Sequence, residues 1–289
     1  MDILTGLLNG VIKRPYVFLF LAVHLFLSIR HLGWRRALLF TGIGYLTALV
    51  CEASSIRNGF PFGLYYYRPE GFEGELTVFG VPYWDSLSFP FLTYFSYTVA
   101  LFLYGPLYKA PRDLQVLETK KLRRSPAVLL TAALFMAVLD TAIDPITLQG
   151  DKWFLGNIYY YPNGGAHFGV PISNYLGWYF VGFVTLVLYA FAEARLFPPA
   201  KGDESGCRHT PFGALAGSAV YLGVVLYMLA VTLYVGDYTL ATASTLVFIL
   251  PLAMGAARIL SAPPPRQEEI SAHVQDFPVS PTARKYFQD

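Results

Sequence analysis

The stretch AVLLTAALFMAVLDTAID, residues 127–144, decides the fold of this chain. Its first thirteen residues carry no charge. A helix that crosses a lipid bilayer needs about 20 mostly apolar residues, which is close to the length of this run. Charge enters only at Asp140 and Asp144, near the end of the run. The sequence therefore predicts a membrane helix that carries two acidic groups at one end.

The composition extends this prediction to the whole chain. Of the 289 residues, 55% are hydrophobic and only 14% are charged, whereas a soluble domain carries roughly a quarter of charged residues. The net charge of +2 does not suggest binding to nucleic acid. Seven candidate spans cover residues 16–29, 34–52, 86–108, 127–144, 170–196, 212–234 and 238–260. We therefore expect an all-α polytopic membrane bundle of about seven helices over residues 1–260, with two aromatic outer loops.

The basic residues predict an orientation in the membrane. Lysines and arginines gather after the first, third and fifth spans and in the tail. The connections between these contain only Arg57, Arg68 and Lys152. Because basic residues favour the cytoplasmic side, the N-terminus is expected outside, and residues 261–289 form a flexible cytoplasmic tail behind three prolines. Lys13 and Arg14 lie on the outer side against this trend, next to an expected amphipathic helix over residues 3–12.

Two outer loops are long, aromatic and poor in charge. They contain GFPFG at 59–63, YYY at 65–67 and FGVPYWD at 79–85, then Trp153, YYYP at 159–162 and HFGVP at 167–171. A free loop would not be so apolar. We expect these loops either to fold back into the mouth of the bundle or to lie in the interface, where Tyr and Trp form aromatic belts.

Polar groups from four expected helices fall at the same depth on the outer side. They are Glu52, Asp85, Asp140, Asp144 and Asn174. An aspartate at the centre of a membrane helix costs about 2.5–3.5 kcal/mol on insertion scales, so such residues are functional candidates by default. Asp140 and Asp144 are four residues apart and share one helix face, where burial and mutual repulsion favour the protonated form of one of them. That is the state of a general acid. Alternatively, Asp144 merely ends the helix before Pro145.

An ordered set of motifs resembles a known family. It comprises Glu52, GFPFG at 59–63 with Tyr65 and Tyr67, GVP at 80–82, Asp140, Asp144-Pro145, Tyr161, GVP at 169–171 and NYLGW at 174–178. This set is similar to the carotenoid biosynthesis membrane protein family, whose characterised members are bisanhydrobacterioruberin and γ-carotene hydratases. Asp85 departs from the family pattern, which mainly has apolar residues after the Val-Pro.

The resemblance implies hydration of a terminal isoprenoid double bond to a tertiary alcohol, on a long polyene dissolved in the bilayer, without a cofactor or metal. This chemistry needs an acid, a means of stabilising a tertiary carbocation, and a positioned water. Asp140 or Asp144 would be the acid, and Glu52, the other aspartate or Asn174 would hold the water. Aromatic faces would stabilise the cation. Substrate contacts are expected at Phe60, Phe62, Tyr65, Tyr67, Trp84, Asp85, Tyr161, His167, Asn174 and Trp178.

Two other interpretations stay open. One is an intramembrane Mg²⁺-dependent prenyltransferase, or another isoprenoid-modifying enzyme, because aspartates four residues apart can hold Mg²⁺ and diphosphate. The other is a non-enzymatic carotenoid-binding, lipid-binding or transport protein, because intramembrane carboxylates also relay protons. In each case we expect a multi-pass protein of the cell membrane with its active-site end on the non-cytoplasmic side. Other enzymes of the carotenoid pathway are candidate partners.

Overall fold

The computed structural model describes residues 2–197 and 209–287. Its helices are α1 (Ile3–Lys13), α2 (Pro15–Leu32), α3 (Trp34–Asn58), α4 (Ser88–Tyr104), α5 (Lys120–Arg123), α6 (Pro126–Thr147), α7 (Ile172–Leu196), α8 (Gly213–Val235), α9 (Tyr238–Ser261), α10 (Gln267–Asp276) and α11 (Pro281–Tyr286). Its strands are β1 (Tyr66–Tyr67), β2 (Thr77–Val78), β3 (Val81–Pro82), β4 (Leu107–Ala110), β5 (Asp113–Val116) and β6 (Tyr159–Tyr160). The strands form three antiparallel pairs, β1–β6, β2–β3 and β4–β5.

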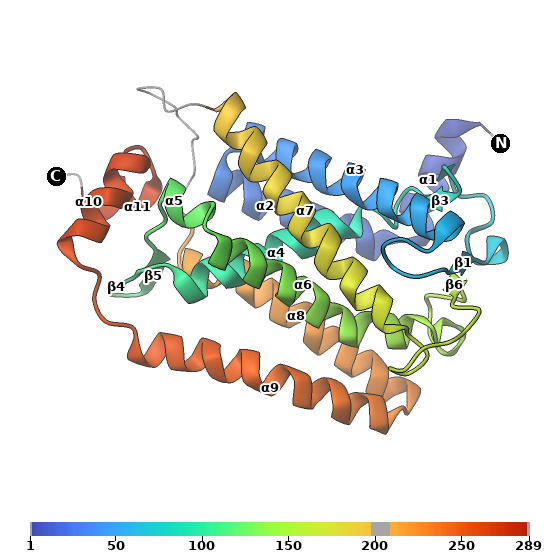
Figure 1. Cartoon of the computed structure of the whole chain (residues 1–289). Helices are drawn as coiled ribbons and strands as arrows, with labels where there is room; N and C mark the ends of the chain where they lie inside the picture. The colour runs from blue at the N-terminus through green and yellow to red at the C-terminus, as the bar shows by residue number, and fades with distance from the viewer. Residues whose placement is uncertain (1, 198–208, 288–289) are drawn as a thin grey trace.

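The long helices form one bundle, which confirms the predicted all-α membrane architecture (Figure 1). Within the described residues, six helices are long and apolar enough to cross a membrane, namely α2, α3, α6, α7, α8 and α9. The chain is therefore a multi-pass membrane protein. The remaining expected span, residues 86–108, is the shorter helix α4. Its 17 residues rise about 26 Å, at the lower limit for crossing the hydrocarbon layer.

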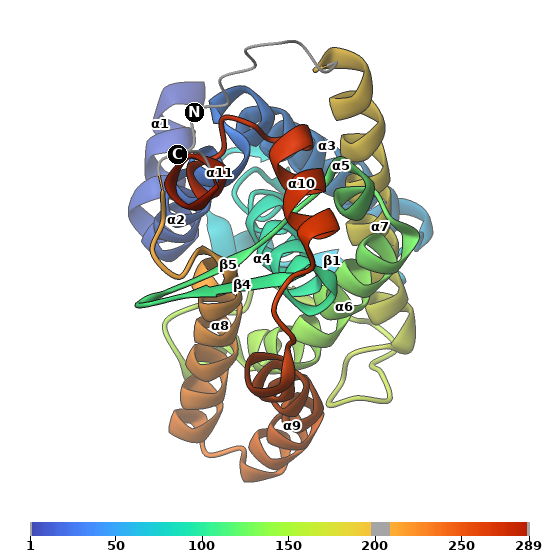
Figure 2. The same ribbon diagram turned by 90° about the vertical axis from the view of Figure 1, so that its left-hand side faces the viewer.

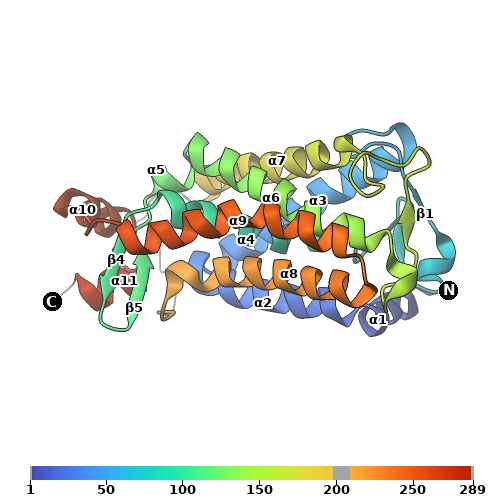
Figure 3. The same ribbon diagram turned by 90° about the horizontal axis from the view of Figure 1, so that it is seen from below.

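Helix α4 occupies the centre of the bundle. It packs against α2, α3, α6, α7 and α8. Its buried side chains include Phe89, Tyr94, Phe95 and Tyr97, so bulky aromatic groups fill the space between the surrounding helices. Helix α9, in contrast, runs along the outside of the bundle next to α8 (Figure 3). Helix α4 contributes side chains to both of the cavities described below, as α2 and α8 also do.

Proline and glycine set several helix boundaries. Pro15 occupies the first turn of α2, where its missing N–H costs no hydrogen bond. Gly33 separates α2 from α3 with φ of 85°, a conformation that side chains rarely adopt. The expected amphipathic helix before Pro15 is confirmed as α1. These boundaries place α1 and the start of α2 beside the outer loops.

Different short helices and strands lie at the two ends of the bundle. Helix α1 and the strands β1, β3 and β6 lie at one end, whereas β4, β5, α5, α10 and α11 lie at the other (Figures 1 and 2). The tail contains the helices α10 and α11. Pro281 occupies the first turn of α11, and Ser280 caps that helix by accepting a hydrogen bond from Ala283 N. The division into a membrane domain and a cytoplasmic tail stays a prediction.

Candidate active site

The polar residues of α6 and α7 meet in the interior of the bundle. Asn174 Nδ2 donates to Asp140 Oδ2 at 2.6 Å and to Asp144 Oδ2 at 2.7 Å. All three side chains are buried. Because Asp140 and Asp144 are one helical turn apart, one amide group from the first turn of α7 can reach both. Both hydrogens of the Asn174 amide are used in holding the two carboxyl groups together.

Helix α6 continues past Asp144, so the alternative that this residue merely ends the helix is wrong. Pro145 lies inside α6, which extends to Thr147. A proline lacks the N–H that would bond to the carbonyl four residues earlier, here that of Thr141. His167 Nε2 lies 3.3 Å from this carbonyl oxygen and donates to it in the tautomer with hydrogen on Nε2. His167 therefore compensates for the proline.

The two aromatic loops are joined by the β1–β6 pair, in which Tyr66 lies opposite Tyr160 and Tyr67 opposite Tyr159. Side chains alternate between the two faces of a strand. Tyr66 and Tyr160 are 41% and 38% exposed. Inside lies a cluster of tyrosine rings with centroids 5.4 to 6.0 Å apart, made of Tyr65, Tyr67, Tyr159 and Tyr161. The loops thus fold back over the carboxyl groups, which was one of the two expected arrangements.

Hydroxyl groups from these loops bond to the acidic side chains. Tyr161 donates to Asp144 Oδ2 at 3.1 Å, Tyr67 donates to Asp85 Oδ2 at 2.7 Å, and Ser86 donates to Glu52. Burial, followed by the nearby Asp144, raises the pKa of Tyr161, so its hydroxyl keeps its proton and acts as a donor. Burial also raises the pKa of Asp85 to about 6, although the hydrogen bond from Tyr67 opposes this change.

A cavity of about 150 Å³ lies beneath the tyrosine cluster. The side chains of Glu52, Asp85 and Asp144 line it, together with Asn174. The rest of its lining is mostly apolar or aromatic, apart from the hydroxyl residues Ser88 and Thr147, and comes from α2, α4, α6, α7, α8 and both loops. Among the described residues that line the cavity, none is Lys, Arg or His. The acidic groups therefore face an apolar space without a cationic side chain in its wall.

Most of the predicted site residues lie in or next to this cavity. Those that line it are Glu52, Phe62, Tyr65, Trp84, Asp85, Asp144, Tyr161, Asn174 and Trp178. Asp140 and Tyr67 lie one hydrogen bond behind the lining, on Asn174 and Asp85. Phe60 lies outside the cavity, since its side chain is 59% exposed and packs against Phe180. His167 also lies outside the lining, at the Pro145 position of α6.

Sequence reasoning missed several lining residues, including Tyr16, Phe20, Tyr159, Val224, Tyr227 and Met228. The sequence could have indicated Tyr159, because residues two apart in an extended segment point to the same side, and Tyr161 was already a candidate. The sequence could also have indicated Ser86, the hydrogen-bond donor to Glu52, because it is a small hydroxyl residue at the start of an apolar run. The side chains from α2 and α8 carried no such indication, since they resemble any other apolar residues of a membrane helix.

Arg14, which ran against the orientation trend, is buried beside the cavity. It forms an ion pair with Glu75 at 3.2 Å and donates to the Leu155 carbonyl oxygen at 2.8 Å. Its guanidinium lies 4.7 Å from the centre of the Trp84 ring. Glu75 thus balances the charge of Arg14 within the protein. The contacts of Arg14 connect the start of α2 to both outer loops.

The fold and the cavity define a multi-pass membrane protein with buried carboxyl groups at one end of an apolar pocket. The family model described as carotenoid biosynthesis protein matches residues 13–252, which is most of the chain. The chain belongs to this family, and the resemblance predicted from its motifs is confirmed. Searches of curated proteins and of solved structures found no significant match.

Proposed function

We propose that this protein is a carotenoid hydratase, which adds water across a terminal isoprenoid double bond. One observation carries the proposal: Asn174 holds the carboxyl groups of Asp140 and Asp144 together at an apolar cavity. Membership in a carotenoid biosynthesis family supports the class of substrate. Hydration of an alkene needs an acid in a dry environment, and a buried carboxyl pair without a cationic partner favours the neutral acid form.

The proposed acid is Asp144, because it lines the cavity whereas Asp140 lies behind Asn174. Asp144 gives its proton to the less substituted carbon of the double bond, which leaves a tertiary carbocation on the other carbon. Water adds to the cation and loses a proton to the carboxylate of Glu52 or Asp85. Return of that proton to Asp144 restores the enzyme, so the net reaction consumes one alkene and one water.

Aromatic rings provide the environment for the cation. Phe62, Tyr65 and Trp178 line the cavity, and Trp178 stacks on Phe89 with centroids 4.6 Å apart. The face of such a ring attracts a cation by roughly 0.5–2 kcal/mol, more when water is excluded. The stacked pair fixes the orientation of Trp178. These rings therefore stabilise the charge that forms during protonation more than they stabilise the neutral alkene.

The size and position of the cavity fit one end of a long substrate. A volume of about 150 Å³ is smaller than the roughly 300–1,000 Å³ that encloses a whole ligand. Phe20 of α2 and Met228 of α8 both line the cavity, and both helices pack against α4. A polyene dissolved in the bilayer would place its terminal unit between α2 and α8 and leave the rest of its chain in lipid.

Expression of the chain in a lycopene-producing host tests this function. Mass analysis of the pigments is expected to show a gain of one water for each end that reacts. Gain of a prenyl unit, lost on EDTA treatment and restored by Mg²⁺, would replace the proposal with a prenyltransferase. Unchanged pigment that copurifies with the protein would replace it with a binding or transport function.

A further inference from the structure

A second and larger cavity lies at the opposite end of the bundle. Its volume is about 350 Å³, and its walls come from the end of α2, the start of α8, α4 and the C-terminal segment around α10. Leu27, Leu101 and Ala214 give it an apolar side. Arg30 and Lys120 also line it. The cavity thus joins an apolar wall to a basic one, and it is separate from the carboxyl site.

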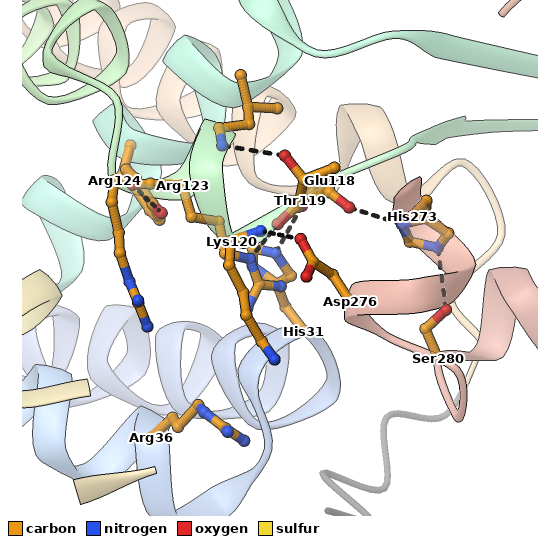
Figure 4. A network of polar contacts seen from close by, with 12 residues as sticks. His31, Arg36, Glu118, Thr119, Lys120, Arg123, Arg124, His273, Asp276 and Ser280 are labelled. Atoms are coloured by element: carbon orange, nitrogen blue, oxygen red, sulfur yellow. Dashed lines mark hydrogen bonds and ion pairs between the residues drawn. The ribbon is translucent and has the colours of Figure 1, made fainter. Parts of the chain in front are cut away.

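Within the described residues, two buried glutamates around this cavity form ion pairs. Glu118 pairs with His31 at 2.7 Å and with Arg123 at 2.5 Å (Figure 4). Glu193 pairs with Arg36 at 3.4 Å and with Arg124 at 3.1 Å. The Asp276 carboxylate accepts a hydrogen bond from the backbone N–H of Lys120 at 2.8 Å.

Among the residues that the structure describes, two basic side chains in the lining have no carboxylate partner. Arg30 donates to the Thr210 hydroxyl at 2.9 Å and to the His209 carbonyl oxygen at 2.5 Å, both of which are neutral acceptors. Within the described residues, Lys120 Nζ has no hydrogen bond or ion pair, and it lies 6.0 Å from the centre of the Phe277 ring. A half-buried cation at the wall of a cavity is stabilised by an anion that enters it.

We propose that this cavity binds a phosphate-bearing anion. Lys120 and Arg30 contact the phosphate, because within the described residues they are the lining Lys and Arg side chains without a carboxylate partner. The apolar wall accepts a hydrocarbon portion of the same molecule, as in the headgroup region of an anionic lipid, where each nearby Lys or Arg contributes about 1 kcal/mol. This site does not depend on the reaction proposed at the other end of the bundle.

Binding to the purified full-length chain in detergent tests the proposal. The probes are phosphatidylglycerol, the zwitterionic lipid phosphatidylcholine, and inorganic phosphate, with bound ligand counted by native mass spectrometry and by the rise in unfolding temperature. Lys120→Gln is compared with Lys121→Gln, because Lys121 is the exposed neighbour, lies outside the cavity and changes the net charge equally. Lys120→Arg keeps the charge and shows whether charge alone restores binding.

We expect Lys120→Gln to weaken the binding of a phosphate-bearing probe by about fivefold, and Lys121→Gln and Lys120→Arg to leave it unchanged. Preference for phosphatidylglycerol over the other two probes identifies a lipid as the source of the phosphate. Equal binding of inorganic phosphate, with the same dependence on Lys120, identifies a free anion. The proposal is overturned if neither phosphatidylglycerol nor inorganic phosphate binds, or if Lys120→Gln and Lys121→Gln behave alike.

Discussion

The two ends of the bundle bury acidic side chains with different partners. At the carboxyl site, Asp144 and Asp85 accept hydrogen bonds from neutral groups, an amide and tyrosine hydroxyls. At the basic end, Glu118 is held by Arg123 and His31. Burial alone would raise the pKa of Glu118, but these two partners lower it below its ordinary value, whereas burial raises the pKa of Asp85 to about 6. Neutral partners leave a carboxyl group able to exchange a proton, while cationic partners keep it ionised.

The largest expected effect follows from removing an acid of the carboxyl site. Asp144→Asn and Asp140→Asn are each expected to lower product formation by 10²-fold or more, the order of magnitude of general acid catalysis. Pigment analysis with quantification of membrane-inserted protein measures this effect. Asp151→Asn is the matched control, because Asp151 is an exposed acidic residue of the second outer loop. Full activity in both site variants would contradict the proposed chemistry.

Breaking an ion pair at the basic end is expected to affect stability instead. Glu193→Gln removes the carboxylate that forms ion pairs with Arg36 and Arg124, and loss of one partner of a buried pair costs about 3–5 kcal/mol. Arg124 is partly exposed, so the lower end of that range applies. Thermal unfolding in detergent measures the loss. Activity per folded molecule is expected to stay unchanged, and a large drop in it would show that the two ends are not functionally distinct.

The pKa of Asp85 predicts a pH dependence of stability. Its rise from 3.8 to about 6 means that folding favours the neutral form. The contribution to stability is therefore complete below about pH 4 and is lost as the pH rises through about 6. This amounts to at most ~3 kcal/mol. Unfolding temperatures from pH 4 to 8 should fall for the wild type relative to Asp85→Asn, and parallel curves would exclude the effect.

A smaller effect is expected from the hydroxyl on Asp144. Tyr161→Phe removes one hydrogen bond to this carboxyl group, and such a bond contributes about 1.5 kcal/mol, or roughly tenfold in rate. Tyr160→Phe is the control, since Tyr160 points away from the cluster on the same strand. Product yield per membrane-inserted protein measures both. Equal yields from the two variants would place Tyr161 outside the reaction.

The sequence predicted the membrane bundle and the convergence of its acidic residues, because hydropathy and residue spacing carry that information. The sequence pattern placed Asp140, Asp144 and Asn174 together, because their depth along two apolar runs was readable. It did not work for Phe20 or Met228, because only the packing of α2 and α8 on α4 brings ordinary apolar residues to the cavity.

The contacts of the tail and of Arg14 could not be predicted from the sequence either. Three prolines end α9 as expected, but the contacts of α10 with the end of the bundle, such as that of His273 with the Glu118 carbonyl oxygen at 2.8 Å, join distant parts of the chain. Arg14 likewise finds Glu75, which is 61 residues away in sequence. Local patterns do not specify such partners.

Oxygen labelling tests the central claim most directly. Membranes that contain the protein are supplied with a carotenoid in H₂¹⁸O, and the product is analysed by mass spectrometry. Each new tertiary alcohol is expected to carry oxygen-18 from water, and Asp144→Asn membranes are expected to form no labelled product while Asp151→Asn membranes do. A product whose oxygen is unlabelled, or equal labelling by both variants, would exclude hydration with Asp144 as the acid.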